Sequence, residues 1–277
     1  MEDKVEKIGE SVIQHGPLSN RIYLMKPAGE DFPGILEKLD ELCGKAGYTK
    51  IIAKTSRALS RFFQDNGYRN EASVPGFYNG IGDTVFFAKY FDKQREIYAR
   101  QKDNERIINM AQQKPRQKNY TLPEGFDIHQ AKDQDVDEMA DVYRCVFPTY
   151  PFPIHDSGYL LQTMKTNVDY FCVCHRDRIV ALASAEKDET WRNVEMTDFA
   201  TLPEFRGKGL ALALLAAMEK HMTALEYPTA YTIARAISPG INITFTKSGY
   251  TFGGTLINNT NIGGQIESMN VWYKRLA

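Results

Sequence analysis

The segment that most constrains this chain runs from Thr197 to Leu225, where a predicted strand passes through a turn containing Gly207 and Gly209 into an apolar helix expected over 212–225. The first turn of a helix leaves backbone amides without partners, and the helix dipole adds positive potential there. The two glycines let the backbone approach a ligand closely. The spacing matches neither a P-loop nor the dinucleotide fingerprint, since position 212 is leucine. The segment therefore predicts a pyrophosphate site of another kind.

This turn, Arg206-Gly207-Lys208-Gly209-Leu210-Ala211, matches the signature [QR]-x-x-G-x-[GA], and the chain here resembles the GCN5-related N-acetyltransferase (GNAT) superfamily. The elements predicted around the turn occur in the order that the superfamily shows. The resemblance covers about residues 120 to 277. It implies an α+β (mixed α/β) fold with a mostly antiparallel sheet and flanking helices, and it implies acetyl-CoA as the cosubstrate. Backbone amides at the end of the signature strand, those of Phe199, Ala200 and Thr201, are then expected to hold pantetheine and polarise the thioester.

The length of 277 residues favours two compact units. A polar, Gln- and Lys-rich stretch from about 98 to 119 looks like a connection between them. We therefore expect a smaller N-terminal α/β domain over 1–110, a linker over 111–122 and the acetyltransferase domain over 123–277. At an offset of 182 residues, six identities link the first unit to the end of the second: Ile51 with Ile233, Phe63 with Phe245, Gly67-Tyr68 with Gly249-Tyr250, Asn79 with Asn261 and Gly82 with Gly264.

These matches predict that the N-terminal domain is a shortened copy of the C-terminal fold, although unrelated strand-turn-strand segments can converge on the same pattern. The first unit has no glycine signature of its own, so we expect it to hold no second cofactor. It is expected to pack on the active domain or to form a dimer contact, which leaves a homodimer open.

Charge and composition narrow the partners. Lys and Arg total 34 against 35 Asp and Glu, so no basic surplus favours nucleic acid or an anionic membrane. No apolar run reaches the 18 residues of a membrane span, and the charged start is unlike a secretory leader. The histidines show no zinc-enzyme spacing, so no metal is expected. A small-molecule amine and a cytoplasmic location are the resulting expectations.

Four segments carry a closer resemblance: Glu195 to Pro203, Ala234-Arg235-Ala236, Pro239 to Asn242 and the tail Asn258 to Lys274. In them the chain resembles the β-lysine N-ε-acetyltransferases of this superfamily. The resemblance implies transfer of acetyl to the ε amine of β-lysine, which gives a neutral osmolyte. Another small amine, an antibiotic or a protein lysine are alternative acceptors, and a non-catalytic acetyl-CoA sensor is an alternative of another class.

Two carboxylates compete for the role of general base. Glu195 lies eleven residues before Arg206, where many superfamily members have a glutamate. A carboxylate there can take the ammonium proton directly or through water. Asp198 is the rival, but strand alternation places it on the opposite face unless a bulge reverses the pattern. A structural or substrate-binding role for Glu195 also stays open.

The usual general acid of the superfamily is absent. Many relatives have a tyrosine four residues before the glycine that ends the late helix, and here that position is Phe245, four before Gly249. Tyr250, Tyr231 or water are the candidates to protonate the thiolate, or it leaves unprotonated. Asn242 matches an asparagine near the pantetheine arm, and it is equally a candidate N-cap of a helix over 243–248.

The acceptor needs a partner for its carboxylate and groups for its amines. Arg235 on the predicted fifth strand is a candidate for the carboxylate, since guanidinium binds carboxylate in a bidentate fashion, and it is equally typical of a solvated surface. Glu267 and the loop with Tyr150 and Phe152 are expected to shape the amine side.

Overall fold

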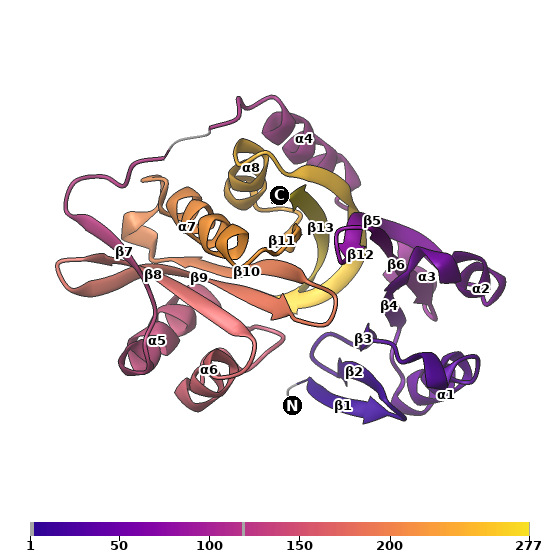
Figure 1. Cartoon of the computed structure of the whole chain (residues 1–277). Helices are drawn as coiled ribbons and strands as arrows, with labels where there is room; N and C mark the ends of the chain where they lie inside the picture. The colour runs from indigo at the N-terminus through magenta and orange to yellow at the C-terminus, as the bar shows by residue number, and fades with distance from the viewer. Residues whose placement is uncertain (1–2, 118–119, 277) are drawn as a thin grey trace.

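The structure, a computed structural model, describes residues 3–117 and 120–276 and consists of one continuous mixed sheet with helices on both faces. The sheet has 13 strands in the order β1-β2-β3-β4-β6-β5-β12-β13-β11-β10-β9-β8-β7. We call residues 4–90 the N-terminal half and residues 126–275 the C-terminal half. The two halves meet where β5 lies beside β12, shown in purple and yellow in Figure 1.

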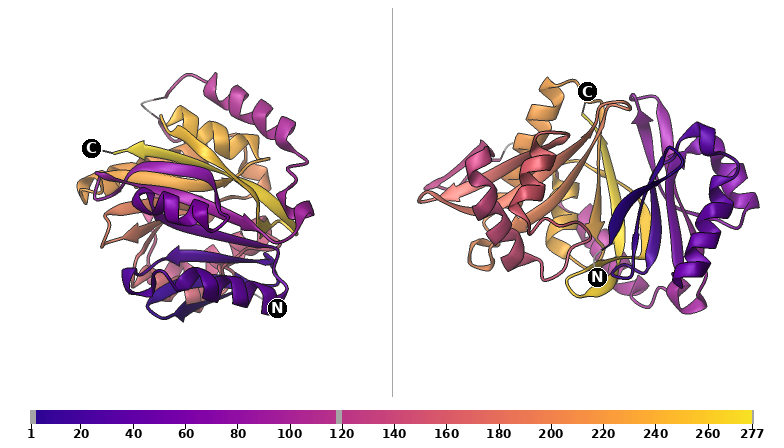
Figure 2. Two further views of the ribbon diagram at one scale, coloured as in Figure 1. Left: turned by 90° about the vertical axis from the view of Figure 1, so that its right-hand side faces the viewer. Right: turned by 90° about the horizontal axis from the view of Figure 1, so that it is seen from below.

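The N-terminal half alternates strands with two helices on its outer face (Figure 2). A short helix and a longer one then lead toward the C-terminal half. The elements are β1 (Lys4–Ile8), β2 (Ser11–Gly16), β3 (Arg21–Lys26), α1 (Ile35–Ala46), β4 (Lys50–Ser56), α2 (Ser60–Asp65), β5 (Arg69–Tyr78), β6 (Gly82–Tyr90), α3 (Lys93–Glu96) and α4 (Gln101–Gln112).

The C-terminal half has α5 and α6 on one face of the sheet and α7 and α8 on the other, where α4 also lies (Figure 1). Its elements are β7 (Phe126–Gln130), α5 (Val136–Val146), α6 (Ser157–Met164), β8 (Val168–His175), β9 (Arg178–Asp188), β10 (Asn193–Thr201), α7 (Leu210–Ala224), β11 (Thr229–Arg235), α8 (Pro239–Lys247), β12 (Thr251–Ile262) and β13 (Gln265–Arg275). Single 3-10 turns span Gly29–Asp31, Arg57–Leu59, Asp133–Asp135 and Pro203–Phe205.

Apolar periodicity explains these helices. In α5 the buried positions Val136, Met139, Ala140 and Tyr143 recur at helical spacing and face the sheet. α7 is apolar nearly all round, because it lies between the sheet and α8 and buries most of its length. The fold class expected from the sequence, a mixed α/β GNAT fold, is confirmed, and the predicted elements of the C-terminal half appear with their ends moved by a few residues.

The described residues form two apolar cores, and one of them joins the halves. One lies under α1 and α2 and includes Ile22, Leu39 and Phe63. The other extends through the C-terminal half and includes the opposite face of the N-terminal strands, with Tyr23, Ile52, Phe77 and Phe86. Since these side chains share a core with α5, β10 and β11, the N-terminal half packs against the C-terminal half through its apolar face.

The strand order agrees with the repeat seen in the sequence. Strands β4-β6-β5 in the first half and β11-β13-β12 in the second have the same order, and a parallel strand precedes each set, β3 beside β4 and β10 beside β11. Ile51 pairs with Lys89, as Ile233 pairs with Val271 182 residues later. β5 has bulges after Asn70 and Val74, and β12 has them after Phe252 and Leu256 at the same offset, although the two hairpin registers differ by three residues.

Among the described residues, none of the helices combines the length and apolar character needed to cross a bilayer.

The joint between the halves depends on a glycine. Gly254 pairs with Ala72 at φ +136°, and a Cβ there would lie 2.2 Å from the Glu71 carbonyl oxygen and 2.6 Å from the Ala72 Cα. We expect Gly254→Ala to lower the free energy of unfolding by about 3 kcal/mol, because overpacking against backbone adds to the strain of the positive φ. Urea denaturation measures this.

Gly44→Ala is the matched control. Gly44 lies on the exposed face of α1, and a Cβ added to it would meet no atom within 4 Å, so alanine should raise stability by about 0.5 to 1 kcal/mol. If Gly254→Ala were as stable as the natural chain, the conclusion that the joint requires glycine at this position would be wrong.

Candidate active site

The site forms where two parallel strands separate. β10 pairs with β11 only from Asn193 to Glu195, with Glu195 opposite Tyr231. Beyond this point β10 has a bulge between Thr197 and Ala200, and Asp198 adopts φ 56°. A bulge bends its strand and leaves residues unpaired. The ends of the two strands therefore diverge and open a gap in the sheet.

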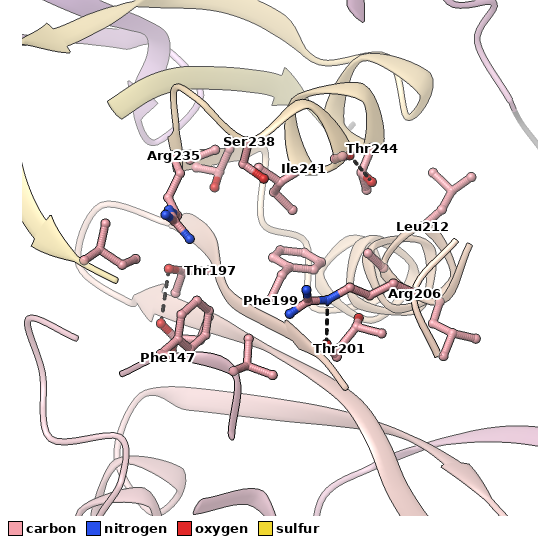
Figure 3. Close-up of a pocket in the computed structure, with 18 of the residues that line it drawn as sticks. Phe147, Thr197, Phe199, Thr201, Arg206, Leu212, Arg235, Ser238, Ile241 and Thr244 are labelled. Atoms are coloured by element: carbon pink, nitrogen blue, oxygen red, sulfur yellow. Dashed lines mark hydrogen bonds between the residues drawn. The ribbon is translucent and has the colours of Figure 1, made fainter. Parts of the chain in front are cut away.

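A cavity of about 560 Å³ fills this gap and extends to the glycine turn before α7 (Figure 3). The predicted residues that line it come from four places: β10, the turn that leads into α7, the loop after α5 and the end of β11. α8 and β11 close the opposite side, and Figure 3 shows Ile241 and Thr244 on α8 facing Phe199 and Arg206. The predicted residues in the lining are Tyr150, Asp198, Phe199, Thr201, Arg206, Gly207, Gly209, Leu210, Ala211 and Arg235.

The turn presents free backbone donors. Gly207 and Gly209 adopt φ 79° and 76°, and the amides of residues 207–211 donate no backbone hydrogen bond within the described chain. A Cβ on Gly207 would meet no atom within 4 Å, so open space lies beside these amides. The N-terminus of α7 adds its dipole at the same place. The turn can therefore accept a phosphate group.

Arg206 and Gly209 are held in place by contacts within the chain. Arg206 Nε donates to the Thr201 carbonyl at 3.3 Å, drawn as a dashed line in Figure 3. The Tyr120 hydroxyl donates to the Lys208 carbonyl, and a Cβ on Gly209 would lie 2.1 Å from this hydroxyl oxygen. Lys208 itself is exposed and does not line the cavity.

The bulge reverses the side on which Asp198 lies. Its carboxylate accepts a hydrogen bond from the Tyr150 hydroxyl and another, at 2.5 Å, from the Ser184 hydroxyl. Ser184 lies on β9 directly opposite Thr197. Simple strand alternation would place Asp198 on the face of the sheet opposite Glu195. The bulge reverses this alternation, as the sequence analysis allowed. Burial raises the pKa of Asp198, and the two hydroxyl donors oppose this by stabilising its ionised form.

Glu195 lies beside the cavity rather than in its wall. Burial and the neighbouring Glu186 carboxylate raise the pKa of Glu195 to about 7, while the Lys54 ammonium and the Tyr231 hydroxyl oppose this. Glu186 lies directly opposite Glu195 on β9. Lys54 Nζ donates to the Tyr231 hydroxyl at 3.0 Å. A carboxyl with a pKa near neutrality can accept and release protons at physiological pH.

The sequence analysis assigned Arg235 to the acceptor's carboxylate and Glu267 to its amine side. In the structure the two side chains bind each other. Arg235 Nε and Nη2 donate to the two carboxylate oxygens of Glu267 at 2.8 and 2.6 Å. Glu267 is buried and outside the cavity lining, whereas Arg235 is in it (Figure 3). The paired carboxylate raises the pKa of the guanidinium. Arg235 is thus already neutralised by a carboxylate of the chain.

The N-cap interpretation of Asn242 is also wrong. α8 begins at Pro239, whose ring favours the first turn of a helix, so Asn242 lies inside the helix. Its amide nitrogen donates to the carbonyls of Arg235 and Ser238, and its oxygen accepts from Asn270 and Trp272, both at 2.9 Å. The side chain is fully buried and connects β11, α8 and β13.

Four further predicted residues lie away from the cavity surface. Phe245 is fully buried, with its ring 5.5 Å from that of Phe199 and 4.9 Å from that of Tyr250. The Tyr250 hydroxyl faces Glu219, which together with burial raises the pKa of this tyrosine well above its usual value. Neither Tyr250 nor Phe152 lines the cavity, and Ala200 is buried behind it. Tyr250 is therefore poorly placed to protonate a thiolate in the cavity.

Several residues at the site were missed by the sequence analysis. These residues lie far from the glycine turn along the sequence, and no local pattern marks them: Lys54, Tyr120, Ser184 and Glu186. The structure also brings the ligand atoms of Asp127, His129 and Cys174 within 4.8 Å of one another across β7 and β8. Burial raises the pKa of the Cys174 thiol to about 11, which disfavours the thiolate that binds metals, and this cluster is remote from the cavity.

Comparison with known proteins gives the class of this chain. The family model described as "Acetyltransferase (GNAT) family" matches residues 136–238, which include β10, the glycine turn and β11. The chain is 40% identical to the "Beta-lysine N(6)-acetyltransferase" of Methanococcus maripaludis over 98% of both proteins. The chain therefore belongs to the GNAT family of acetyltransferases.

Two further proteins complete the comparison. The protein of the same name from Methanosarcina mazei is 35% identical, over 89% of this chain and 100% of that protein. The solved structure of the putative acetyltransferase yncA from Salmonella typhimurium "with its cofactor Acetyl-CoA" is 13% identical, covers 55% of this chain and 95% of its own, and superposes with a TM-score of 0.48.

The buried network around Asn242 should be essential for stability. Asn242→Leu leaves the indole N–H of Trp272 and one of the two amide N–H groups of Asn270 unpaired in the interior, since the other still donates to Asn104. We expect a loss of about 3 kcal/mol, because each buried unsatisfied donor costs about 1 to 3 kcal/mol. Thermal and urea unfolding measure it.

Thr244→Ala, on the same helix, is the control and should change stability by less than about 0.5 kcal/mol, since this partly exposed hydroxyl bonds only the Gly240 carbonyl. Similar losses in both variants would show that the helix, rather than the network, is responsible.

Proposed function

We propose that this chain transfers the acetyl group of acetyl-CoA to the ε amine of β-lysine. The observation that carries this proposal is the cavity itself. It connects free amides at a helix N-terminus to the Asp198 carboxylate, and Glu195 lies beside it on the same strand. The names of the two full-length relatives support the acceptor, and membership of the GNAT family supports the acetyl donor.

The chain's residues fit acetyl-CoA, which supplies an activated acetyl thioester. The amides of 207–211 would hold the diphosphate, and Arg206 would add charge beside it. Phe199 and Thr201, at the diverging end of β10, would position the pantetheine and the thioester carbonyl. An amide there stabilises the negative charge that develops on this carbonyl oxygen.

Glu195 is the proton acceptor in this proposal. The amine attacks only as a free base, so one ammonium proton must be removed first. Both oxygens of Asp198 already accept hydroxyl hydrogen bonds, which lowers its basicity, whereas the pKa of Glu195 is raised to about 7. Glu195 takes the proton through water, and Asp198 with Tyr150 binds the ammonium group as it arrives.

The departing thiolate needs no tyrosine at position 245. Phe245 is buried against Phe199, and Tyr250 faces Glu219. A thiol has an ordinary pKa of about 8.5, so the thiolate is a good leaving group near neutral pH. The attacking nitrogen loses a second proton as the amide forms and the carbon–sulfur bond of the thioester breaks. One of the two protons can pass to the thiolate and the other to solvent water, or both can pass to water, which balances the reaction.

We also propose the domain division 1–110, 111–122 and 123–277, with the first unit a shortened copy of the second. The matching strand order supports it. The copy has no equivalent of the glycine turn before α1, so a single acetyl-CoA per chain is expected.

The base assignment predicts a pH profile. Because Glu195 must be deprotonated to act, the logarithm of kcat/KM for β-lysine should rise with a slope near one up to pH about 7 and flatten above it. Glu195→Gln should lower kcat by roughly 100- to 1,000-fold and remove this inflection. Thiol release followed over a pH series measures both.

Acetyl-CoA affinity is the control for that variant and should stay within about twofold by calorimetry, since Glu195 is remote from the glycine turn. Activity of Glu195→Gln close to that of the natural chain would exclude the role. Turnover with peptides but not with free amino acids would overturn the acceptor, and failure to acetylate any amine would support a sensor.

The cofactor turn gives a separate prediction. Gly209→Ala places a methyl group against the Tyr120 hydroxyl at a positive φ, so the turn must move. We expect at least a roughly tenfold loss of acetyl-CoA affinity, about 1.4 kcal/mol, measured by calorimetry.

Gly209→Ala with Tyr120→Ala tests the cause, because the double variant removes both the hydroxyl and the ring carbons that would lie 2.1 to 2.7 Å from the methyl carbon, and it should recover part of the affinity. Unchanged binding in Gly209→Ala would show that the diphosphate lies elsewhere.

A further inference from the structure

We propose that the N-terminal half completes the acceptor site, with Lys54 binding the acceptor's carboxylate and Glu186 its second ammonium group. Selectivity for a diamino acid over a plain diamine would then come from the half of the chain that lacks the glycine turn. This inference rests on the proposed function and extends it to residues outside the acetyl-CoA cavity.

Lys54 is a cation with spare hydrogen-bonding capacity. It lies on β4, is partly exposed, and donates to the Tyr231 hydroxyl at 3.0 Å. Its ammonium lies 5.4 Å from the ring centres of both Phe77 and Tyr231. Within the described chain no carboxylate oxygen lies within 4.0 Å of it, unlike Lys50 on the same strand, which pairs with Glu71 at 2.9 Å. Donors of Lys54 thus remain for a ligand.

Glu186 faces this cation from the C-terminal half. It lies opposite Glu195 in the β9–β10 register, and among the described residues its carboxylate has no hydrogen bond or ion pair. Burial raises the pKa of Glu186, and the Lys54 charge opposes this. Two neighbouring carboxylates and one ammonium leave net negative charge, which an incoming ammonium group neutralises.

Tyr23 of β3 borders the same cluster. Its side chain is 8% exposed, and it interacts electrostatically with both Glu195 and Glu186. The N-terminal half therefore contributes two polar side chains, Lys54 and Tyr23, beside the two carboxylates.

The arrangement of charges matches the proposed acceptor. β-Lysine has two amines joined through four carbons, about 6 Å apart when extended, with the carboxylate two carbons beyond the inner amine. Residues directly opposite on neighbouring strands have Cβ atoms about 5 Å apart. With the reacting amine near Glu195, the inner amine reaches Glu186, and the adjacent carboxylate faces Lys54.

The cluster continues into the cavity. Thr197 lies two residues after Glu195 on the same face of β10 and lines the cavity together with Asp198 and Phe199. An acceptor held by Lys54 and Glu186 therefore extends its outer amine toward the thioester position. Tyr159 of α6, which interacts electrostatically with Asp198 and Glu186, borders the cluster from the other side.

The experiment compares two acceptors that differ only in the carboxylate-bearing group. β-Lysine and butane-1,4-diamine both place their nitrogens four carbons apart. Lys54→Met removes the charge and keeps the length of the side chain. We compare the acceptors on the plateau of the pH profile, where Glu195 is deprotonated in both proteins. There we expect Lys54→Met to lower kcat/KM for β-lysine roughly 30-fold or more and to change that for the diamine less than about threefold. Lys54→Arg should recover part of the selectivity.

Lys93→Met, an exposed lysine on α3 with no ion pair among the described residues, is the control and should behave as the natural chain. Glu186→Gln should lower kcat/KM for β-lysine and for the diamine by the same factor, because both acceptors carry the second amine. Lys54→Gln replaces Lys54→Met if the latter does not fold, as judged by thermal unfolding.

The outcomes separate this inference from the proposed function. Suppose that the natural chain acetylates β-lysine, but Lys54→Met lowers kcat/KM equally for both acceptors and shifts the pH profile. Lys54 would then only adjust the pKa of Glu195, and this inference alone would be overturned. Unchanged kinetics of Lys54→Met would overturn it as well. No turnover of β-lysine by the natural chain would overturn the proposed function, and this inference with it.

Discussion

The loss of pairing between β10 and β11 beyond Glu195 and Tyr231 is the constraint on which the rest of the site depends. A sheet normally satisfies its backbone groups strand by strand, and a gap in its middle leaves them available. The bulge at Asp198 bends β10 toward β9 and away from β11. α8 and the loop after α5 then close the gap from either side, and the glycine turn lies at its open end. A flat, fully paired sheet with the same residues would have no cavity here.

Local sequence patterns correctly predicted the features that depend on the backbone conformation of a few neighbouring residues. The strand, glycine turn and helix from Thr197 onward form as expected, because Gly207 and Gly209 adopt the positive φ that glycine allows. The start of α8 was placed too late, although Pro239 is itself a signal for a first helical turn. Asp198 shows the limit of such reasoning: alternation predicts its face correctly only where a strand has no bulge, and the bulge depends on the register with β9.

Pairings between distant segments were beyond the sequence. Arg235 and Glu267 were both recognised as charged site candidates, but nothing in a linear pattern shows that they bind each other across β11 and β13. The repeat predicted the strand order of the N-terminal half, yet not that β5 would join β12. The one local trace of this joint is Gly253-Gly254, which permits the close backbone contact. The glycine turn was therefore visible in the sequence, while the pairings of the charged residues around the cavity were not.

The N-terminal half acts on the carboxylates in two opposing ways. Its apolar face, with Tyr23 and Phe77, shares the core that buries the region around Glu195, and burial raises the pKa of a carboxyl. Its Lys54 ammonium lowers the same pKa. Burial alone would push Glu195 toward a permanently protonated acid, whereas the ammonium alone would keep it a weak base. The Glu186 carboxylate of β9 raises the pKa as well. Because Lys54 and part of the burying core belong to the N-terminal half, the pKa of about 7 depends on how the two halves pack together and not on β10 alone.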